Sequence, residues 1–312
     1  MTLHQAELLL AAVIAARATS FLFSKILLVE MGPFSLMGLR FLLASLILAL
    51  AFNRRLRSLP RQAVLHGLIV GSVFFATMAF ELYALVYTDS GMVALLENLA
   101  IILVPLSEAL LVRRFPNRAV AIAVPLAVGG VFCSAAGRGV FCSPMGFFGI
   151  GELLALGAAV CYTVTILLTA RVAKTDDPLG IGIVQLLAMS AFSIVCAFLF
   201  EQPTLPTDGI GWASLVVLVV VCTGFGFTLQ PVAQRYLSAG RAGLFCAITP
   251  LVASVLGMMF LGETGNVLTY AGIGFIVVAM VVANLTPGQE KVPEGSVKRM
   301  APSDLAAERR GQ

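Results

Sequence analysis

The stretch Gly91–Val112, GMVALLENLAIILVPLSEALLV, decides how this sequence folds. Its length suits a helix that crosses a bilayer, because a hydrocarbon core about 30 Å thick requires roughly 20 apolar residues. It nevertheless contains two carboxylates, Glu97 and Glu108. Their spacing of 11 residues returns them to the same side of a helix. The stretch therefore predicts a membrane-spanning helix that turns its carboxylates toward the interior of the protein.

The whole chain has the composition of an integral membrane protein. Of its 312 residues, 59% are hydrophobic and 12% are charged, and the mean hydropathy is +0.99. Soluble domains have a charged fraction of about 25%. Because lipid offers no hydrogen-bond partner to an unpaired backbone group, we expect an all-α integral membrane protein.

Apolar runs bounded by proline, glycine and charged clusters predict ten transmembrane helices. In the first half they cover residues 6–29, 33–52, 63–87, 91–112 and 118–136. In the second half they cover residues 147–170, 178–200, 211–234, 241–262 and 266–285. Residues 286–312 are polar and rich in Pro, Glu, Lys and Arg, which is typical of a disordered tail.

Basic residues orient the predicted helices. The loops after the second, fourth, sixth and eighth helices contain four, three, two and two Lys or Arg residues, whereas the odd-numbered loops contain only Arg138. The positive-inside rule then places both termini in the cytoplasm of a protein of the cell (inner) membrane. The net charge of +4 follows from this topology and the tail, so it indicates a lipid environment and no nucleic-acid partner.

The two halves of the sequence resemble each other. A shift of 145 residues overlays Ala6–Leu9 on Gly151–Leu154, and a shift of 149 overlays Gly91 on Gly240. Five helices per copy make the second copy enter the membrane in the opposite direction. The sequence therefore predicts two inverted five-helix repeats, residues 1–140 and 146–285, with a substrate site near the midplane between them.

The segment Tyr236–Glu263 carries a family resemblance: small residues, a mid-helix proline, Pro250, and an apolar run that ends in Gly-Glu. This pattern resembles the ninth helix of EamA-type carriers of the drug/metabolite transporter superfamily, and Arg40 in GLRFLLA also matches that family. The resemblance covers residues 6–285. It implies a secondary carrier, often an exporter of amino acids, other small metabolites or drugs. The first repeat departs from the pattern, with Arg114 at the position that matches Glu263, so the resemblance implies no particular substrate.

In the first repeat, six charged side chains lie within predicted helices and away from the helix ends: Arg17, Lys25, Arg40, Glu81, Glu97 and Glu108. Each charge at a helix centre costs about 2.5–3.5 kcal/mol, so we expect them to face one another or a cavity. One interpretation is an ion-pair network that holds the first four helices together. The other is a site for a substrate carboxylate, a substrate amine or a proton. Glu81 and Glu97 have similar predicted depths and could share a proton, provided that neither Arg40 nor Lys25 lies between them.

The candidate substrate- or proton-binding residues combine charged groups with polar side chains that could line a cavity. They are Arg17, Lys25, Arg40, Glu81, Glu97, Asn98, Tyr83, Tyr162, Gln185 and Gln230. A small zwitterionic metabolite would satisfy both signs of charge. A channel, or a non-transporting scaffold or sensor built on a structural ion-pair network, is the alternative.

Residues for other chemistry are sparse in this sequence. The two histidines, His4 and His66, lie near the predicted cytoplasmic side, so the sequence predicts no metal site, no cofactor and no enzyme. Cys133 and Cys142 lie near one predicted outer loop and could form a disulfide. Nothing in the sequence indicates an oligomeric state.

Overall fold

The computed structural model describes residues 3–111, 118–137, 149–172, 178–226, 248–263 and 265–285. Every regular element in these ranges is a helix, in agreement with the predicted all-α class. The first half contains α1 (Leu3–Leu27), α2 (Pro33–Ala51), α3 (Asn53–Arg57), α4 (Arg61–Tyr87), α5 (Ser90–Glu97), α6 (Ala100–Leu111) and α7 (Arg118–Gly137). The second half contains α8 (Ile150–Val172), α9 (Pro178–Phe200), α10 (Gly209–Val217), the π-helix η2 (Leu218–Phe225), α13 (Ile248–Leu261) and α14 (Val267–Leu285).

The helices are apolar on their outside as well as between one another. Five of those described are long and apolar enough to cross a membrane, and five shorter apolar helices accompany them. Large apolar side chains such as Leu50, Phe198 and Met259 are exposed on the outside of the bundle. Such a surface is typical of helices that face lipid, so the protein is an integral membrane protein.

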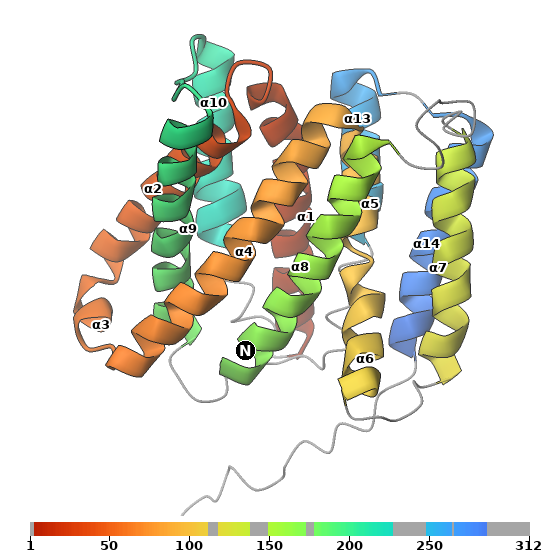
Figure 1. Ribbon diagram of the computed structural model, residues 1–312, viewed down its shortest axis with the longest axis horizontal. Coiled ribbons are helices and arrows are strands. Elements are labelled where there is room, and N and C mark those ends of the chain that lie inside the picture. The colour runs from red at the N-terminus through yellow and green to blue at the C-terminus, as the bar shows by residue number, and fades with distance from the viewer. Residues whose placement is uncertain are drawn as a thin grey trace, which may run out of the picture.

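Hydrogen bonds at one end of the bundle establish the directions of the helices. Lys25, near the end of α1, donates to the carbonyl of Thr88, which follows α4. The Thr88 hydroxyl donates to Glu152 in the first turn of α8. The end where α1 and α4 finish and α5 and α8 begin is called the outer end below, and it lies at the top of Figure 1. Consequently α1 and α8, the first helices of the two halves, run in opposite directions.

The halves interlock through α4, which crosses the front of the bundle in Figure 1 and packs against both α8 and α9. Small residues permit this contact. A Cβ atom at Gly71 would lie 2.8 Å from the carbonyl oxygen of Gln185, and one at Gly67 would lie 2.8 Å from the side chain of Val184. At one side of the bundle α7 pairs with α14.

The predicted helix 91–112 is interrupted. The structure divides it into α5 and α6, with a turn at Asn98 and Leu99. The Asn98 side-chain amide donates to the carbonyl of Ala94 at 2.7 Å, which competes with the regular ladder of backbone bonds. Farther along, Pro105 has no N–H for the carbonyl of Ile101. The unpredicted helix α3 lies within the arginine-rich loop.

Several predictions fall outside the described residues. They concern Gln230, Cys142, the tail 286–312, the predicted helix 211–234 beyond Gly226 and the first residues of the predicted helix 241–262. The side chain of Glu108 is likewise outside the described part of α6.

Candidate substrate site

Four charged side chains from four helices interact in the interior of the bundle: Arg17 of α1, Arg40 of α2, Glu81 of α4 and Glu97 of α5. We call them the central cluster. Arg40, Glu81 and Glu97 expose only 3%, 2% and 4% of their surface. Burial of this kind is tolerated for charged groups only when they have partners of opposite charge or a bound ligand.

The two carboxyl groups of the cluster meet directly. Glu81 and Glu97 lie close enough for their carboxyl groups to interact. An ionised carboxylate can only accept hydrogen bonds, so a hydrogen bond between the two groups requires a proton on one of them. One oxygen of Glu97, Oε2, is buried and has no hydrogen-bond partner among the residues that the structure describes. The pair can therefore hold a proton and still offer an acceptor to a donor.

Arg40 is fixed by the second half of the chain. Its Nε donates to the hydroxyl of Thr223 in η2 at 2.8 Å, and its guanidinium carbon lies 5.3 Å from the centre of the Phe41 ring. Its charge acts on Glu81. The π-helix η2 of the second half therefore positions Arg40 of the first half. π-Helices are often found at functional sites.

Arg17 approaches the same segment from α1. It is half-buried, and its charge acts on both Glu81 and Glu97. A Cβ atom at Gly226 would lie 2.8 Å from Cγ of Arg17, so the absence of a side chain at residue 226 leaves space for the arginine. Two residues along α1, the hydroxyl of Thr19 lies 3.4 Å from the Cys222 sulfur.

The helix break lies beside the carboxyl pair. Glu97 is the last residue of α5, and the buried Asn98 forms the turn that follows it. Discontinuous helices in transporters end where their backbone lines a binding site or cavity. The polar Asn98, one of the candidate residues, therefore has a structural role in placing Glu97 next to Glu81.

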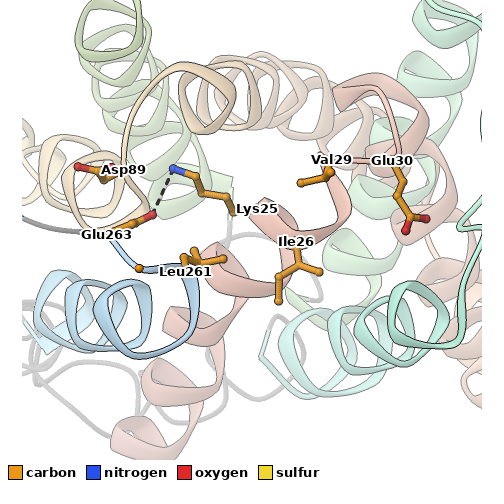
Figure 2. Close-up of a pocket in the computed structure, with 8 residues that line it drawn as sticks. Lys25, Ile26, Val29, Glu30, Asp89, Leu261 and Glu263 are labelled. Carbon is orange, nitrogen blue, oxygen red and sulfur yellow. Dashed lines mark ion pairs between the residues drawn. The ribbon is translucent and has the colours of Figure 1, made fainter.

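Lys25 lies apart from the central cluster, at the outer end. Its Nζ is 3.2 Å from Glu263 Oε1 and donates to the Thr88 carbonyl at 2.7 Å. Eight residues, about 12 Å of helix, separate Lys25 from Arg17. Helix α1 therefore places Arg17 at the central cluster and Lys25 at the outer end. Figure 2 shows Lys25 and Glu263 pointing toward one another in a pocket of about 660 Å³, the outer pocket, which Glu30 and Asp89 also line.

The remaining candidates make contacts of other kinds. The Tyr83 hydroxyl donates to Glu201 at 3.1 Å, near the outer end, and the ring of Tyr162 stacks on Phe74 with centroids 6.0 Å apart. Gln185 is buried on α9 where Gly71 approaches its backbone. The position of Gln230 lies outside the described residues.

The sequence did not single out three residues that the structure places beside Arg17 and Arg40: Thr223, Cys222 and Gly226. It also did not single out Glu201, which accepts from Tyr83 and from the start of α2 at the outer end, away from the central cluster. A threonine, a cysteine and a glycine inside an apolar run are ordinary packing residues, and Glu201 follows its helix in a loop. No signal in the sequence distinguishes them. Within the described residues, no group of three or more His, Cys, Asp and Glu side chains is arranged to hold a metal ion.

Comparison with known proteins gives matches along most of the chain. The EamA-like transporter family matches residues 5–136 and 149–285. An uncharacterized transporter of Archaeoglobus fulgidus is 28% identical over 294 residues, 88% of this chain and 95% of that protein. The threonine/homoserine exporter RhtA of Escherichia coli K12 is 28% identical over 145 residues, so the match spans about half (47%) of the exporter and 45% of this chain.

A solved crystal structure shares the fold, with a TM-score of 0.64 over 91% of this chain and 98% of its own, at 21% sequence identity. The names of the family and of the exporter indicate a transporter rather than an enzyme. Because the family matches both halves of the sequence, the protein belongs to the EamA-like transporter family.

Proposed function

We propose that the protein is a secondary carrier that exports a small zwitterionic metabolite, an amino acid or a related compound, by alternating access. The central cluster binds the substrate, with Arg17 and Arg40 near its carboxylate and Glu97 near its ammonium group. The name of the threonine/homoserine exporter supports this class of substrate for the family.

The observation that carries the proposal is the unpartnered oxygen of Glu97. A network that served only to hold helices together would satisfy each of its buried oxygens, because an unpaired acceptor surrounded by apolar groups is unfavourable. Within the described part of the chain, Glu97 Oε2 has no partner, although it is buried among helices that bring two arginines and a second carboxyl group to the same place. An ammonium group of the substrate would supply the missing donor.

The proposal includes coupling to protons. Glu81 and Glu97 lie close enough to interact, and a hydrogen bond between two carboxyl groups requires one proton. An ammonium group that binds to Glu97 would favour the ionised form of the pair. Binding of the substrate then releases the proton, so that substrate and proton move in opposite directions across the membrane.

The same proposal assigns a topology. It has ten spans in two inverted five-helix repeats, 1–140 and 146–285, in the cell (inner) membrane with both termini in the cytoplasm. The opposite directions of α1 and α8 support the inversion, and the arginine-rich segment of α3 supports a cytoplasmic position for the end opposite the outer pocket.

Transport in proteoliposomes tests the function. Uptake and efflux of a labelled amino-acid panel that includes threonine and homoserine would be measured with and without a pH gradient, for the wild type, Glu97→Gln and Glu201→Gln. Glu201 is the control, because it binds the start of α2 at the outer end, away from the central cluster. We expect a pH gradient to stimulate flux in the wild type and the control, and Glu97→Gln to reduce that stimulation at least about tenfold, the effect of one lost interaction of roughly 1.4 kcal/mol.

Each contrary result removes a different part of the proposal. Equal flux in Glu97→Gln and wild type would exclude Glu97 from substrate and proton binding and leave it a structural role. Flux that depends on Glu97 but not on the gradient would eliminate proton coupling and keep the carrier. Flux for none of the panel would eliminate amino acids as substrates.

A further inference from the structure

Three buried side-chain oxygens lie along the contact between α1, α5 and α13, which we call the seam. Among the residues that the structure describes, the buried side-chain oxygens or nitrogens without a hydrogen-bond partner are Ser24 Oγ of α1, Glu97 Oε2 of α5 and Ser254 Oγ of α13. These three helices pack against one another. Unsatisfied buried groups are uncommon in proteins and require an explanation, which for a transporter is a partner that arrives in another state.

The oxygens extend inward from the outer pocket. Ser24 lies about 4.5 Å along α1 from the end of that helix, and Ser254 lies about 10 Å from the end of α13. Glu97 lies about 10 Å from the start of α5. The three positions therefore connect the level of the outer pocket with the level of the central cluster.

The contact between α5 and α13 is made by glycines. A Cβ atom at Gly91 would lie 2.9 Å from Cα of Ser254, and one at Gly257 would lie 2.6 Å from the hydroxyl of Ser90. Small residues at this contact let the two helices approach each other closely.

One ion pair closes the seam at the outer end. Glu263 follows α13, accepts from the backbone N–H and the hydroxyl of Ser90 at 2.8 Å each, and pairs with Lys25 of α1 at 3.2 Å. Lys25 also holds the Thr88 carbonyl. Figure 2 shows this pair on one side of the outer pocket, with Glu30 on the other side of the end of α1. Lys25 and Glu263 thus join the ends of three helices above the three unpartnered oxygens.

We propose that the seam between α1, α5 and α13 is the outward exit route for the substrate and that the Lys25–Glu263 pair is the latch that closes it. The inference rests on the proposed carrier function. When the latch opens, the hydroxyls of Ser24 and Ser254 offer hydrogen bonds to a polar, zwitterionic solute or its water, and the charges of Lys25, Glu263, Glu30 and Asp89 receive it at the mouth.

The accessibility of the seam tests the latch without any substrate. Ser24→Cys would be introduced alone and together with Glu263→Gln, Lys25→Met or Glu201→Gln, and a membrane-impermeant thiol reagent would be added to the outer face of right-side-out vesicles. Mass spectrometry would give the labelling rate at residue 24. Cys161 of α8 is the internal reference for general loosening, because it lies on a helix outside the seam.

We expect both latch variants to raise the rate at residue 24 at least about tenfold relative to Cys161, and the Glu201→Gln control to leave it unchanged. Equal rates in all four proteins, or labelling from the inner face only, would overturn the inference. A parallel rise at Cys161 in both latch variants would show general unfolding and would also overturn it. Because the assay needs no transported compound, a silent amino-acid panel with a positive labelling result would reject the substrate and keep the exit route.

Discussion

Arg40 illustrates how single residues of the two halves depend on each other. Its guanidinium group is buried, held at Nε by Thr223 and placed over the Phe41 ring, and its charge acts on Glu81. A hydrogen bond at Nε fixes the plane of the guanidinium fork, which determines the direction in which it can bind a carboxylate.

Replacement of Thr223 by valine removes this bond and keeps the side-chain volume. We expect substrate affinity to fall about tenfold or more, because Arg40 loses its fixed orientation. Thr165→Val is the matched control: it removes a hydroxyl contact with Thr77 elsewhere in the bundle. Both variants should lose roughly 0.6 kcal/mol of stability. Binding titrations and thermal unfolding in detergent measure the two effects, and an equal loss of affinity in both variants would contradict the role of Thr223.

At the scale of helices, the contact between α4 and α9 joins the two halves of the protein. Gly67 and Gly71 lie on one face of α4. A Cβ atom at either residue would lie 2.8 Å from an atom of α9, which is closer than van der Waals contact allows. Lipid supplies no hydrophobic force between helices, so close packing of small residues is what stabilises such a contact.

A valine at residue 71 would collide with the carbonyl oxygen of Gln185, which cannot move away as the end of a flexible side chain could. We expect Gly71→Val to destabilise the protein by about 1–3 kcal/mol, the usual effect of overpacking. Gly182→Val on α9 is the control, because a Cβ atom there would meet nothing within 4 Å. Thermal unfolding in detergent compares the two variants. Equal unfolding midpoints would contradict the prediction, because they would mean that the contact between α4 and α9 accommodates the valine.

For the whole molecule, four carboxylates at the outer end each connect one half to the other. Glu30 accepts from Thr207, Glu152 from Thr88, Glu201 from Ser35 and Glu263 from Ser90. The opposite end carries the basic α3 segment. The positive-inside rule associates a basic end with the cytoplasm, so this asymmetry supports the proposed orientation.

Reporter fusions measure that orientation. Alkaline phosphatase inserted after Gln202, in the loop that follows α9, should be active, because the proposed topology places the outer end on the periplasmic side. A fluorescent protein fused to the C-terminus should fluoresce, because the proposed tail is cytoplasmic. The reversed pattern would invert the topology and place the outer pocket in the cytoplasm.

The sequence was sufficient to predict the helical class, most helix boundaries and the buried charges. A charge within an apolar run is conspicuous because each one is costly in lipid, which is why the sequence alone points to Arg40, Glu81 and Glu97. The break after Glu97 was missed, because the apolar pattern continues through it and the competing bond of Asn98 to Ala94 depends on local geometry.

Partnership between distant residues was decided only by tertiary structure. The sequence grouped Lys25 with the central charges from its estimated depth, but packing of α1 against α13 pairs it with Glu263, 238 residues away. Thr223 and Gly226 gained their positions beside Arg40 and Arg17 in the same way. Hydropathy is a property of each segment and is fixed along the chain, whereas the partner of a buried charge depends on which helices meet, and that is settled by packing between the two halves.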